Sequence, residues 1–279
     1  MNEKQTVVIF STAYLPFIGG AELAIKEITD RVPEYNFILV TSRMRRSLSR
    51  REQVGMVEVC RVGIGVPLLD KIFSPLLAAW HVYAIAKRHR VCLFWSVMVS
   101  YTTITPVILN MFGFYTDIPF LVTLQEGDSK EHLFHGRFGF IAYWWRASLR
   151  YASHVQVIST YLEKLTQQFG YRGTVSVVPN GVDTSVFYPR KNEQGEHVII
   201  TTSRLVRKNG VDLLIKAMQT IALQIPTAKL EIIGDGPDRE ILEHMADKIM
   251  KVFPTRIIFH HEVPFDKVPE KLGRARVFV

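Results

Sequence analysis

Short apolar runs and segments of helical spacing alternate along the chain. Thr6–Phe10 (TVVIF) is a continuous apolar run, typical of a parallel strand that is buried on both faces. A glycine-containing loop follows, and apolar spacing predicts a helix that begins near Ala21. The same order recurs in predicted strands at Asn36–Thr41, Val57–Val62, Val91–Ser96, Phe120–Thr123, His154–Ile158 and Val175–Val178, and in predicted helices at Pro75–Lys87, Phe138–Tyr151 and Tyr161–Phe169. This alternation predicts an α/β fold with a doubly wound parallel sheet.

The pattern breaks at Val186–Glu196, a polar segment with the composition of a linker. Strands and helices then resume at His197–Thr202, Asp212–Leu223, Lys229–Ile233, Asp238–Met250 and Arg256–Phe259. We therefore predict two Rossmann-like domains, residues 1–190 and 191–279. The last segment, Ala275–Val279, reads as the start of a strand without the helix that usually follows one, so we expect the second domain to be incomplete.

Composition narrows the class of protein. The 279 residues are 48% hydrophobic, which excludes disordered and fibrous chains. Cys60 and Cys92 lie far apart without metal-ligand spacing, and the N-terminus lacks the apolar region of a signal peptide. Polar residues and Pro106 interrupt the longest apolar stretch, Val91–Tyr115, so we predict a strand and a buried helix there instead of a membrane span. These features predict a cytoplasmic protein.

Two cations lie in the turn between a predicted strand and a predicted helix. The segment Thr201–Met218 reads TTSRLVRKNGVDLLIKAM, with Arg204 and Lys208 between the two elements. Turns at the carboxyl ends of parallel strands form ligand crevices, and Arg and Lys bind phosphate as a planar fork and a point charge. The residues alone leave two alternatives: a diphosphate site, or two solvated cations on an exposed loop.

Three glycine-containing turns occupy similar positions. In Ile18–Glu22 (IGGAE), Gly19 and Gly20 precede a helix whose N-terminus can attract an anion. Gly234–Asp238 (GDGPD) follows the strand KLEII, and Val178–Val182 (VPNGV) ends a strand. Each can be a plain turn or can let the backbone approach a ligand. None matches the Gly-x-Gly-x-x-Gly fingerprint, which argues against a dinucleotide-dependent oxidoreductase.

Taken in order, four segments resemble the retaining glycosyltransferases of family 4, which have the two-domain GT-B fold. They are YLPFIGGAE, VPNGVD, SRLVRKNGVDLLIKAM and IIGDGPDRE. The resemblance implies a donor site for a nucleotide-diphosphate sugar in the C-terminal domain and an acceptor site in the N-terminal domain. It implies that Arg204 and Lys208 stabilise the leaving diphosphate as catalytic residues, with the donor also contacted by Gly19, Gly20, Gly234, Gly236 and Val263. Such catalysis is electrostatic, and no metal or other cofactor is expected.

The acceptor side of the resemblance falls on Leu121–Leu133, LVTLQEGDSKEHL. Family members often have Thr-x-His here, and this chain has Gln125 where the histidine is expected. Glu126 and Asp128 remain to bind acceptor hydroxyls or, for Glu126, to act as a catalytic base. Capping of the next helix is the alternative for these carboxylates. We predict Gln125, Glu126 and Asp128 as acceptor-binding residues.

The family also carries a Glu-x7-Glu element shortly after a strand that resembles RARVFV. The sequence stops at Val279, before that element, so we expect a C-terminally truncated member. We predict transfer of a hexose, with retention, to a saccharide or lipid-linked acceptor. The alternative is a non-catalytic remnant that binds the nucleotide or the sugar.

Basic residues are concentrated in the first part of the chain. The net charge is +8, and residues 1–190 hold 20 basic and 14 acidic side chains against 14 and 12 afterwards. Arginines cluster within residues 43–51, and a second cluster occupies residues 87–90. These clusters predict a contact with an anionic membrane surface, a contact with acceptor phosphate, or a solvated face. Nucleic acid is not expected, because no recognised binding module accompanies the charge. The aromatic residues 138–145 predict either an interfacial anchor or core packing.

Overall fold

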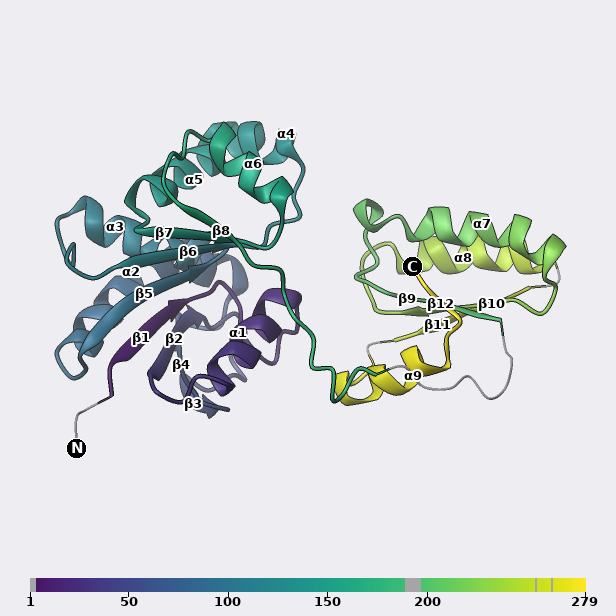
Figure 1. Ribbon diagram of the computed structural model, residues 1–279, viewed down its shortest axis with the longest axis horizontal. Coiled ribbons are helices and arrows are strands. Elements are labelled where there is room, and N and C mark those ends of the chain that lie inside the picture. The colour runs from purple at the N-terminus through teal and green to yellow at the C-terminus, as the bar shows by residue number, and fades with distance from the viewer. Residues whose placement is uncertain (1–3, 189–196, 254, 262) are drawn as a thin grey trace. The chain divides into compact units, whose positions relative to one another are not determined.

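The chain folds into two compact α/β units, Met1–Gly181 and Val182–Val279 (Figure 1). The computed structural model describes residues 4–188, 197–253, 255–261 and 263–279. The predicted boundary at residue 190 and most of the predicted linker lie outside the described residues. Within these residues, no helix is long and apolar enough to cross a membrane.

The first unit is built on an eight-stranded sheet in the order β3-β4-β2-β1-β5-β6-β7-β8. Its strands are β1 (Thr6–Phe10), β2 (Asn36–Ser42), β3 (Arg51–Val54), β4 (Val57–Val62), β5 (Val91–Val97), β6 (Phe120–Leu124), β7 (His154–Val157) and β8 (Val175–Val177). All neighbouring pairs are parallel except β3 and β4. The predicted α/β fold is confirmed, and the antiparallel edge strand β3 is an addition to it.

Helices cover both faces of this sheet (Figure 1). They are α1 (Gly20–Asp30), α2 (Pro67–Ala86), α3 (Thr105–Met111), α4 (Lys130–His135), α5 (Phe140–Tyr151) and α6 (Thr160–Gln168), with 3-10 turns η1 (Tyr101–Ile104) and η2 (Gly136–Gly139). Alternate residues of β1 enter opposite cores: Val7 and Ile9 pack with α1, whereas Val8 and Phe10 pack with α2, α3, α5 and α6. This alternation explains why the strand is apolar throughout.

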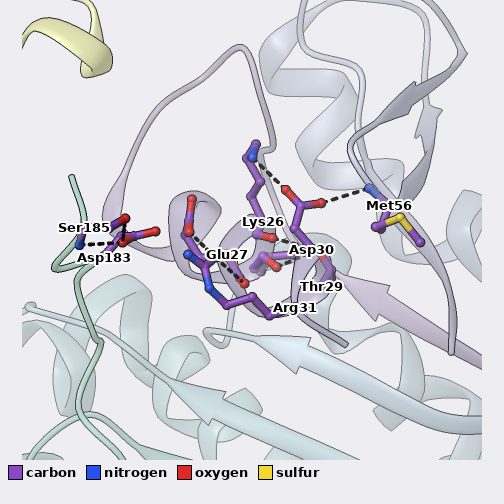
Figure 2. A network of polar contacts seen from close by, with 9 residues as sticks. Lys26, Glu27, Thr29, Asp30, Arg31, Met56, Asp183 and Ser185 are labelled. Atoms are coloured by element: carbon purple, nitrogen blue, oxygen red, sulfur yellow. Dashed lines mark hydrogen bonds and ion pairs between the residues drawn. The ribbon is translucent and has the colours of Figure 1, made fainter. Parts of the chain in front are cut away.

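The far end of α1 is tied to the hairpin between β3 and β4. Figure 2 shows the Asp30 carboxylate between the Lys26 ammonium, 2.7 Å away, and the backbone N–H of Met56, 2.9 Å away. Thr29 Oγ1 donates to the Ile25 carbonyl at 2.8 Å on the same helix. The cation and the N–H that bind the Asp30 carboxylate keep its pKa below its usual value, although partial burial opposes them. Its charged form therefore holds α1 in place.

The second helix, α2, begins eight residues before the predicted start. The sequence suggested a start at Pro75, because proline is favoured in a first helical turn. In the structure Pro67 occupies that turn and Pro75 lies inside the helix. Pro75 has no N–H for the carbonyl of Lys71, and Ser74 Oγ donates to that carbonyl at 2.9 Å instead. The prediction was wrong because this side-chain compensation is not visible in apolar spacing.

The second unit has a four-stranded parallel sheet in the order β11-β10-β9-β12. Its elements are β9 (Val198–Thr202), η3 (Arg207–Asn209), α7 (Val211–Gln224), β10 (Lys229–Ile233), α8 (Arg239–Met250), β11 (Arg256–His260), η4 (Phe265–Lys267), α9 (Val268–Arg274) and β12 (Val277–Phe278). Figure 1 shows α7 and α8 side by side on one face of the sheet and α9 on the other. The strands and the helices α7 and α8 match their predictions closely, whereas α9 was not predicted.

Two loops meet backbone to backbone at the carboxyl edge of this second sheet. Ser203 N donates to the Ile233 carbonyl at 3.0 Å, and Leu205 N donates to the Asp235 carbonyl at 2.9 Å. A Cβ on Gly234 would lie 2.0 Å from the Ser203 carbonyl oxygen, and one on Gly236 would lie 2.3 Å from that of Leu205. Gly234 also has a φ of 134°, which side chains disfavour. These two glycines allow the contact that fixes the loop on both sides of Arg204.

We predict that Gly236→Ala lowers the free energy of unfolding by roughly 1–3 kcal/mol, because the methyl group must displace backbone atoms. Gly20→Ala is the matched control, because a Cβ there meets nothing within 4 Å. Alanine in the first turn of α1 should leave stability unchanged or raise it by up to about 1 kcal/mol. Denaturant unfolding of both variants measures the difference. Equal stabilities would contradict the packing role of Gly236.

Candidate functional site

The predicted cations stand at the carboxyl end of β9, in the turn that leads to α7. Arg204 and Lys208 are both exposed, and buried Leu205 anchors the turn between them. Asn209 Nδ2 donates to the Arg204 carbonyl at 2.7 Å, which closes the turn. The helix α7 then starts at Val211, and its N-terminus carries a partial positive charge. The turn therefore presents two cationic side chains and a helix N-terminus at one edge of the sheet.

A polar cluster lies beside this turn, at the carboxyl ends of β10 and β11. Asp235 accepts from the backbone N–H of Gly236 at 2.7 Å, and this bond is the main reason that its pKa falls below its usual value. Arg239 NH1 is 3.3 Å from the Asp235 carboxylate, and His261 Nδ1 is 3.7 Å from it. Val263 follows β11 at the same edge and is half-buried. The sequence prediction included neither Asp235, Arg239 nor His261.

In the first unit, β2, β4 and β3 lie on one side of β1, and β5 and the later strands lie on its other side. The carboxyl ends of β1 and β5 therefore form a topological switch point. Thr12 Oγ1 and Ser100 Oγ are 2.8 Å apart and join the loops that leave these two strands. Gly19 caps α1 next to this point without a side-chain cap. Gly20 is exposed and faces open space, so packing among the described residues of this unit does not require its missing side chain.

Glu126 joins the loops that follow β5 and β6. Its Oε1 accepts from the Val99 N–H at 2.6 Å, and its Oε2 accepts from the Gln125 N–H at 2.9 Å. The residue is 7% exposed. Burial raises the pKa of Glu126 to about 7, although the backbone N–H donors act in the opposite direction. The two bonds make Glu126 a brace for the loops on the predicted acceptor side.

The two other predicted acceptor residues flank Glu126. Gln125 Oε1 accepts from Asn180 Nδ2 at 3.0 Å, which brings the TLQEGD and VPNGV segments together. Asp128 is half-buried. The cap of α4 is Ser129, whose Oγ accepts from the His132 N–H at 3.3 Å, so Glu126 does not fill the capping role considered as its alternative. The structure thus gathers the predicted acceptor residues at the carboxyl edge of β6.

Asp70 is a buried carboxylate that the sequence analysis passed over. It is 2% exposed and accepts from the backbone N–H groups of Met44, Ile64 and Gly65 at 3.2, 2.8 and 2.7 Å. These bonds tie the start of α2 to the loops after β2 and β4. A single acidic residue in a mostly apolar helix is the sequence signal that could have identified it.

The predicted basic and aromatic surfaces are only partly exposed. Arg43 donates to the carbonyls of Leu48 and Arg46 at 2.9 and 2.7 Å, so it shapes its own loop. Trp145 is fully buried in the core, so of the two alternatives for the aromatic residues, core packing holds for this one. Phe138, in contrast, is fully exposed. Among the described residues, no group of three His, Cys, Asp or Glu side chains could hold a metal ion.

Two family models match adjoining parts of the chain, which together span residues 18–279. The model described as "Glycosyltransferase Family 4" matches residues 18–186, and the one described as "Glycosyl transferases group 1" matches residues 186–279. The first match covers the glycine loop before α1 and the predicted acceptor residues. The second covers both cations and the GDGPD turn.

Curated relatives match shorter parts of the chain. A GDP-mannose-dependent alpha-(1-6)-phosphatidylinositol monomannoside mannosyltransferase of Mycolicibacterium smegmatis is 29% identical over 148 residues, which are 48% of this chain and 38% of that protein. The phosphatidylinositol N-acetylglucosaminyltransferase gpi3 subunit of Schizosaccharomyces pombe is 32% identical over 107 residues, 38% of this chain and 23% of that protein. The chain thus spans well under half the length of these relatives.

Solved structures share the fold over nearly the whole chain. Sucrose-phosphate synthase from Thermosynechococcus elongatus superposes with a TM-score of 0.80 at 15% identity, covering 98% of this chain and 74% of the other. The catalytic domain of starch synthase IV from Arabidopsis thaliana gives 0.70 at 12% identity, covering 99% and 78%. The chain has two Rossmann-like units, and each of the two family models matches one of them. The chain therefore belongs to Glycosyltransferase Family 4, the retaining glycosyltransferases of the GT-B fold.

Proposed function

We propose that this protein transfers a hexose from a nucleotide-diphosphate sugar to a lipid-linked or saccharide acceptor, with retention of anomeric configuration. The observation that carries the proposal is the turn after β9, where exposed Arg204 and Lys208 precede the N-terminus of α7. Family membership supports the reaction class. The names of the curated relatives include phosphatidylinositol or its monomannoside, which favours a lipid-linked acceptor. We expect the reaction to take place at the cytoplasmic face of a membrane, as the sequence prediction of a cytoplasmic protein suggests.

The chemistry asked of this turn is stabilisation of a leaving group. Negative charge accumulates on the departing nucleoside diphosphate as the glycosidic bond breaks, and fixed cations lower the energy of that state. Arg204 offers a planar fork of donors, and Lys208 offers a compact point charge. The contact between the loops around Gly234 and Gly236 holds the backbone on both sides of Arg204, which limits the reorganisation needed during reaction.

The first unit supplies the proposed acceptor side. Gln125, Glu126 and Asp128 lie at the carboxyl edge of β6, and the bonds from Val99 and Gln125 hold Glu126 in place. Both carboxylate oxygens of Glu126 accept backbone N–H groups. We therefore propose that Glu126 positions these loops and does not act as the catalytic base. Gly20 leaves room at the N-terminus of α1 for a donor phosphate, whereas the Glu22 carboxylate lies next to Gly19.

We expect Lys208→Ala to lower kcat/KM for sugar transfer by about 100-fold, because removing one donor to a developing anion has effects of this order. Arg207→Ala is the matched control, since Arg207 is an exposed cation in the same turn. Transfer is measured from a panel of UDP-, GDP- and ADP-sugars to phosphatidylinositol and to simple saccharides. Equal losses in the two variants, or no turnover with any donor, would count against the proposal.

We expect Gly20→Ala to lower kcat/KM for the donor by about tenfold while leaving stability intact, because a small misplacement of bound substrate is costly. The physical reason is that the methyl group occupies space that the described residues of this unit leave empty. The same protein sample used for unfolding is assayed for transfer. Full activity in this variant would show that no donor phosphate approaches Gly20.

We expect Glu126 to make stability depend on pH. Its pKa of about 7 in the folded chain lies above the ordinary value of 4.5, so the folded chain keeps a proton that the unfolded chain loses. This contribution to stability is complete below pH 4.5 and is lost as the pH rises to about 7. Unfolding free energies measured across this range should fall more steeply in the wild type than in Glu126→Gln.

Glu131→Gln provides the control for this titration, because Glu131 is exposed on the neighbouring helix α4. This variant should keep the wild-type slope of stability against pH. If Glu126→Gln keeps that slope as well, the raised pKa of the buried carboxyl is refuted.

A further inference from the structure

The helix α2 has an exposed face made of large apolar side chains. Six of them have exposed fractions between 46% and 71%: Leu68, Ile72, Phe73, Leu76, Trp80 and Tyr83. Most recur at steps of three or four residues, so they form one continuous stripe along the helix. We call this stripe the α2 apolar face. Contiguous exposed surfaces of this kind mark sites of interaction.

The opposite side of α2 already packs into the first unit. Ala78, Val82 and Ile85 are buried in the core with Phe94 and Val107. A helix that is apolar on all sides is normally enclosed on all sides. Here the core covers only half of the helix, and the described residues of the first unit leave the α2 apolar face uncovered.

Charge identifies the partner that fits this face. Between Glu58 and Asp117, a stretch described in full, the only acidic residue is Asp70, and it is buried. The exposed cations Lys87, Arg88 and Arg90 follow the end of α2. A second copy of the chain would bring the same cations and no exposed acid over this stretch. An anionic lipid surface supplies both the apolar interior and the negative charge.

Aromatic residues lie where the apolar stripe meets these cations. The rings of Trp80 and Tyr83 are 6.1 Å apart, and the Lys87 ammonium is 4.4 Å from the centre of the Tyr83 ring. Tryptophan and tyrosine favour the depth at which a bilayer changes from acyl chains to headgroups. Large apolar side chains with a tryptophan on the outward face, and cations next to it, supply the apolar area and the positive charge that bind a helix to an anionic membrane surface.

The middle of α2 is held near the proposed acceptor loops. Thr102 Oγ1 in η1 donates to Ser74 Oγ at 2.7 Å, and Thr105 Oγ1 is 3.3 Å from the Pro75 carbonyl. The turn η1 follows Val99, whose N–H binds Glu126. The core-facing side of α2 is therefore bonded to η1, which directly follows the loop braced by Glu126.

We propose that the α2 apolar face docks the protein onto an anionic membrane, so that a lipid-linked acceptor reaches the loop around Glu126 without leaving the bilayer. The inference deepens the proposed function and rests on it for the identity of the acceptor. Membrane binding itself requires no donor sugar, and it can be measured separately from transfer. Lys208→Ala should abolish most transfer and leave membrane binding unchanged.

The test is co-sedimentation of the 279-residue chain with vesicles of 70% phosphatidylcholine and 30% phosphatidylglycerol (~100 nm diameter), an anionic surface that attracts cations near it. The double variant Leu76→Ser/Trp80→Ser should reduce the bound fraction at least about tenfold, because it removes apolar area from the interface. The variant Lys87→Gln/Arg88→Gln should reduce the bound fraction by about tenfold, since each cation near an anionic surface adds to the attraction between the protein and the lipid headgroups. Vesicles of phosphatidylcholine alone should bind weakly.

Matched controls come from the second unit. Leu213 and Leu223 on α7 are exposed to 65% and 70%, so Leu213→Ser/Leu223→Ser removes similar apolar area elsewhere. Lys248→Gln/Lys251→Gln on the exposed side of α8 removes the same charge. Both controls should bind vesicles as the wild type does. Circular dichroism of every variant verifies that the fold is intact.

Three results would overturn the proposal. One is equal loss of binding in the α7 or α8 controls, which would indicate non-specific adhesion. Another is equal binding to neutral and anionic vesicles. The third is a dimer in sedimentation velocity that Leu76→Ser/Trp80→Ser converts to a monomer without any vesicle binding by either form, since a second copy would then cover the face.

Discussion

The loops at the carboxyl edges of both sheets need acceptors for backbone N–H groups that have left the strand ladders. In the first unit two buried carboxylates provide them. Asp70 accepts three such groups from the loops after β2 and β4, and Glu126 accepts two from the loops after β5 and β6. In the second unit the loops after β9 and β10 pair directly, and Gly234 and Gly236 make their close approach possible. The placement of Arg204 and of the predicted acceptor loop depends on these bonds.

This constraint has a chemical consequence. Loops held by buried bonds keep their side chains in place, and preorganised charges are the chief means by which a leaving diphosphate can be stabilised. The two units satisfy their loop N–H groups in different ways, and the free-energy cost differs. A buried carboxylate must be desolvated, which raises the pKa of Glu126, whereas backbone pairing across glycines buries no charge.

The surface of the first unit points to the same kind of reaction. Its helix α2 is apolar towards the core and apolar towards the outside, and cations follow its C-terminal end. A lipid-linked acceptor requires its enzyme to work at a bilayer, so the uncovered face of α2 and the proposed substrate class support each other.

Much of the fold could be read from local pattern. The segments that became β1, β9 and β10 were assigned almost to the residue. β1 is a continuous apolar run buried on both faces, whereas buried and half-buried residues alternate at the start of β9 and β10, and both patterns are visible in the local sequence. The edge strand β3 was missed because its residues, REQV, are half-exposed and carry no apolar signal. The start of helix α2 was predicted too late, because Ser74 donates to the carbonyl that Pro75 leaves without a backbone donor.

For the candidate site, the sequence by itself determined which turns are the candidates, since the strand-to-helix turn around Arg204 and the glycine pair before α1 are local patterns. Only the tertiary structure decided what braces them. Glu126 binds Val99 across 27 residues of sequence, Asp70 binds Met44 across 26, and the glycines of GDGPD meet Ser203 and Leu205 from the preceding strand's loop. Local spacing reports which face of an element is buried, whereas these partners are brought together only when parallel strands align their carboxyl ends at one edge.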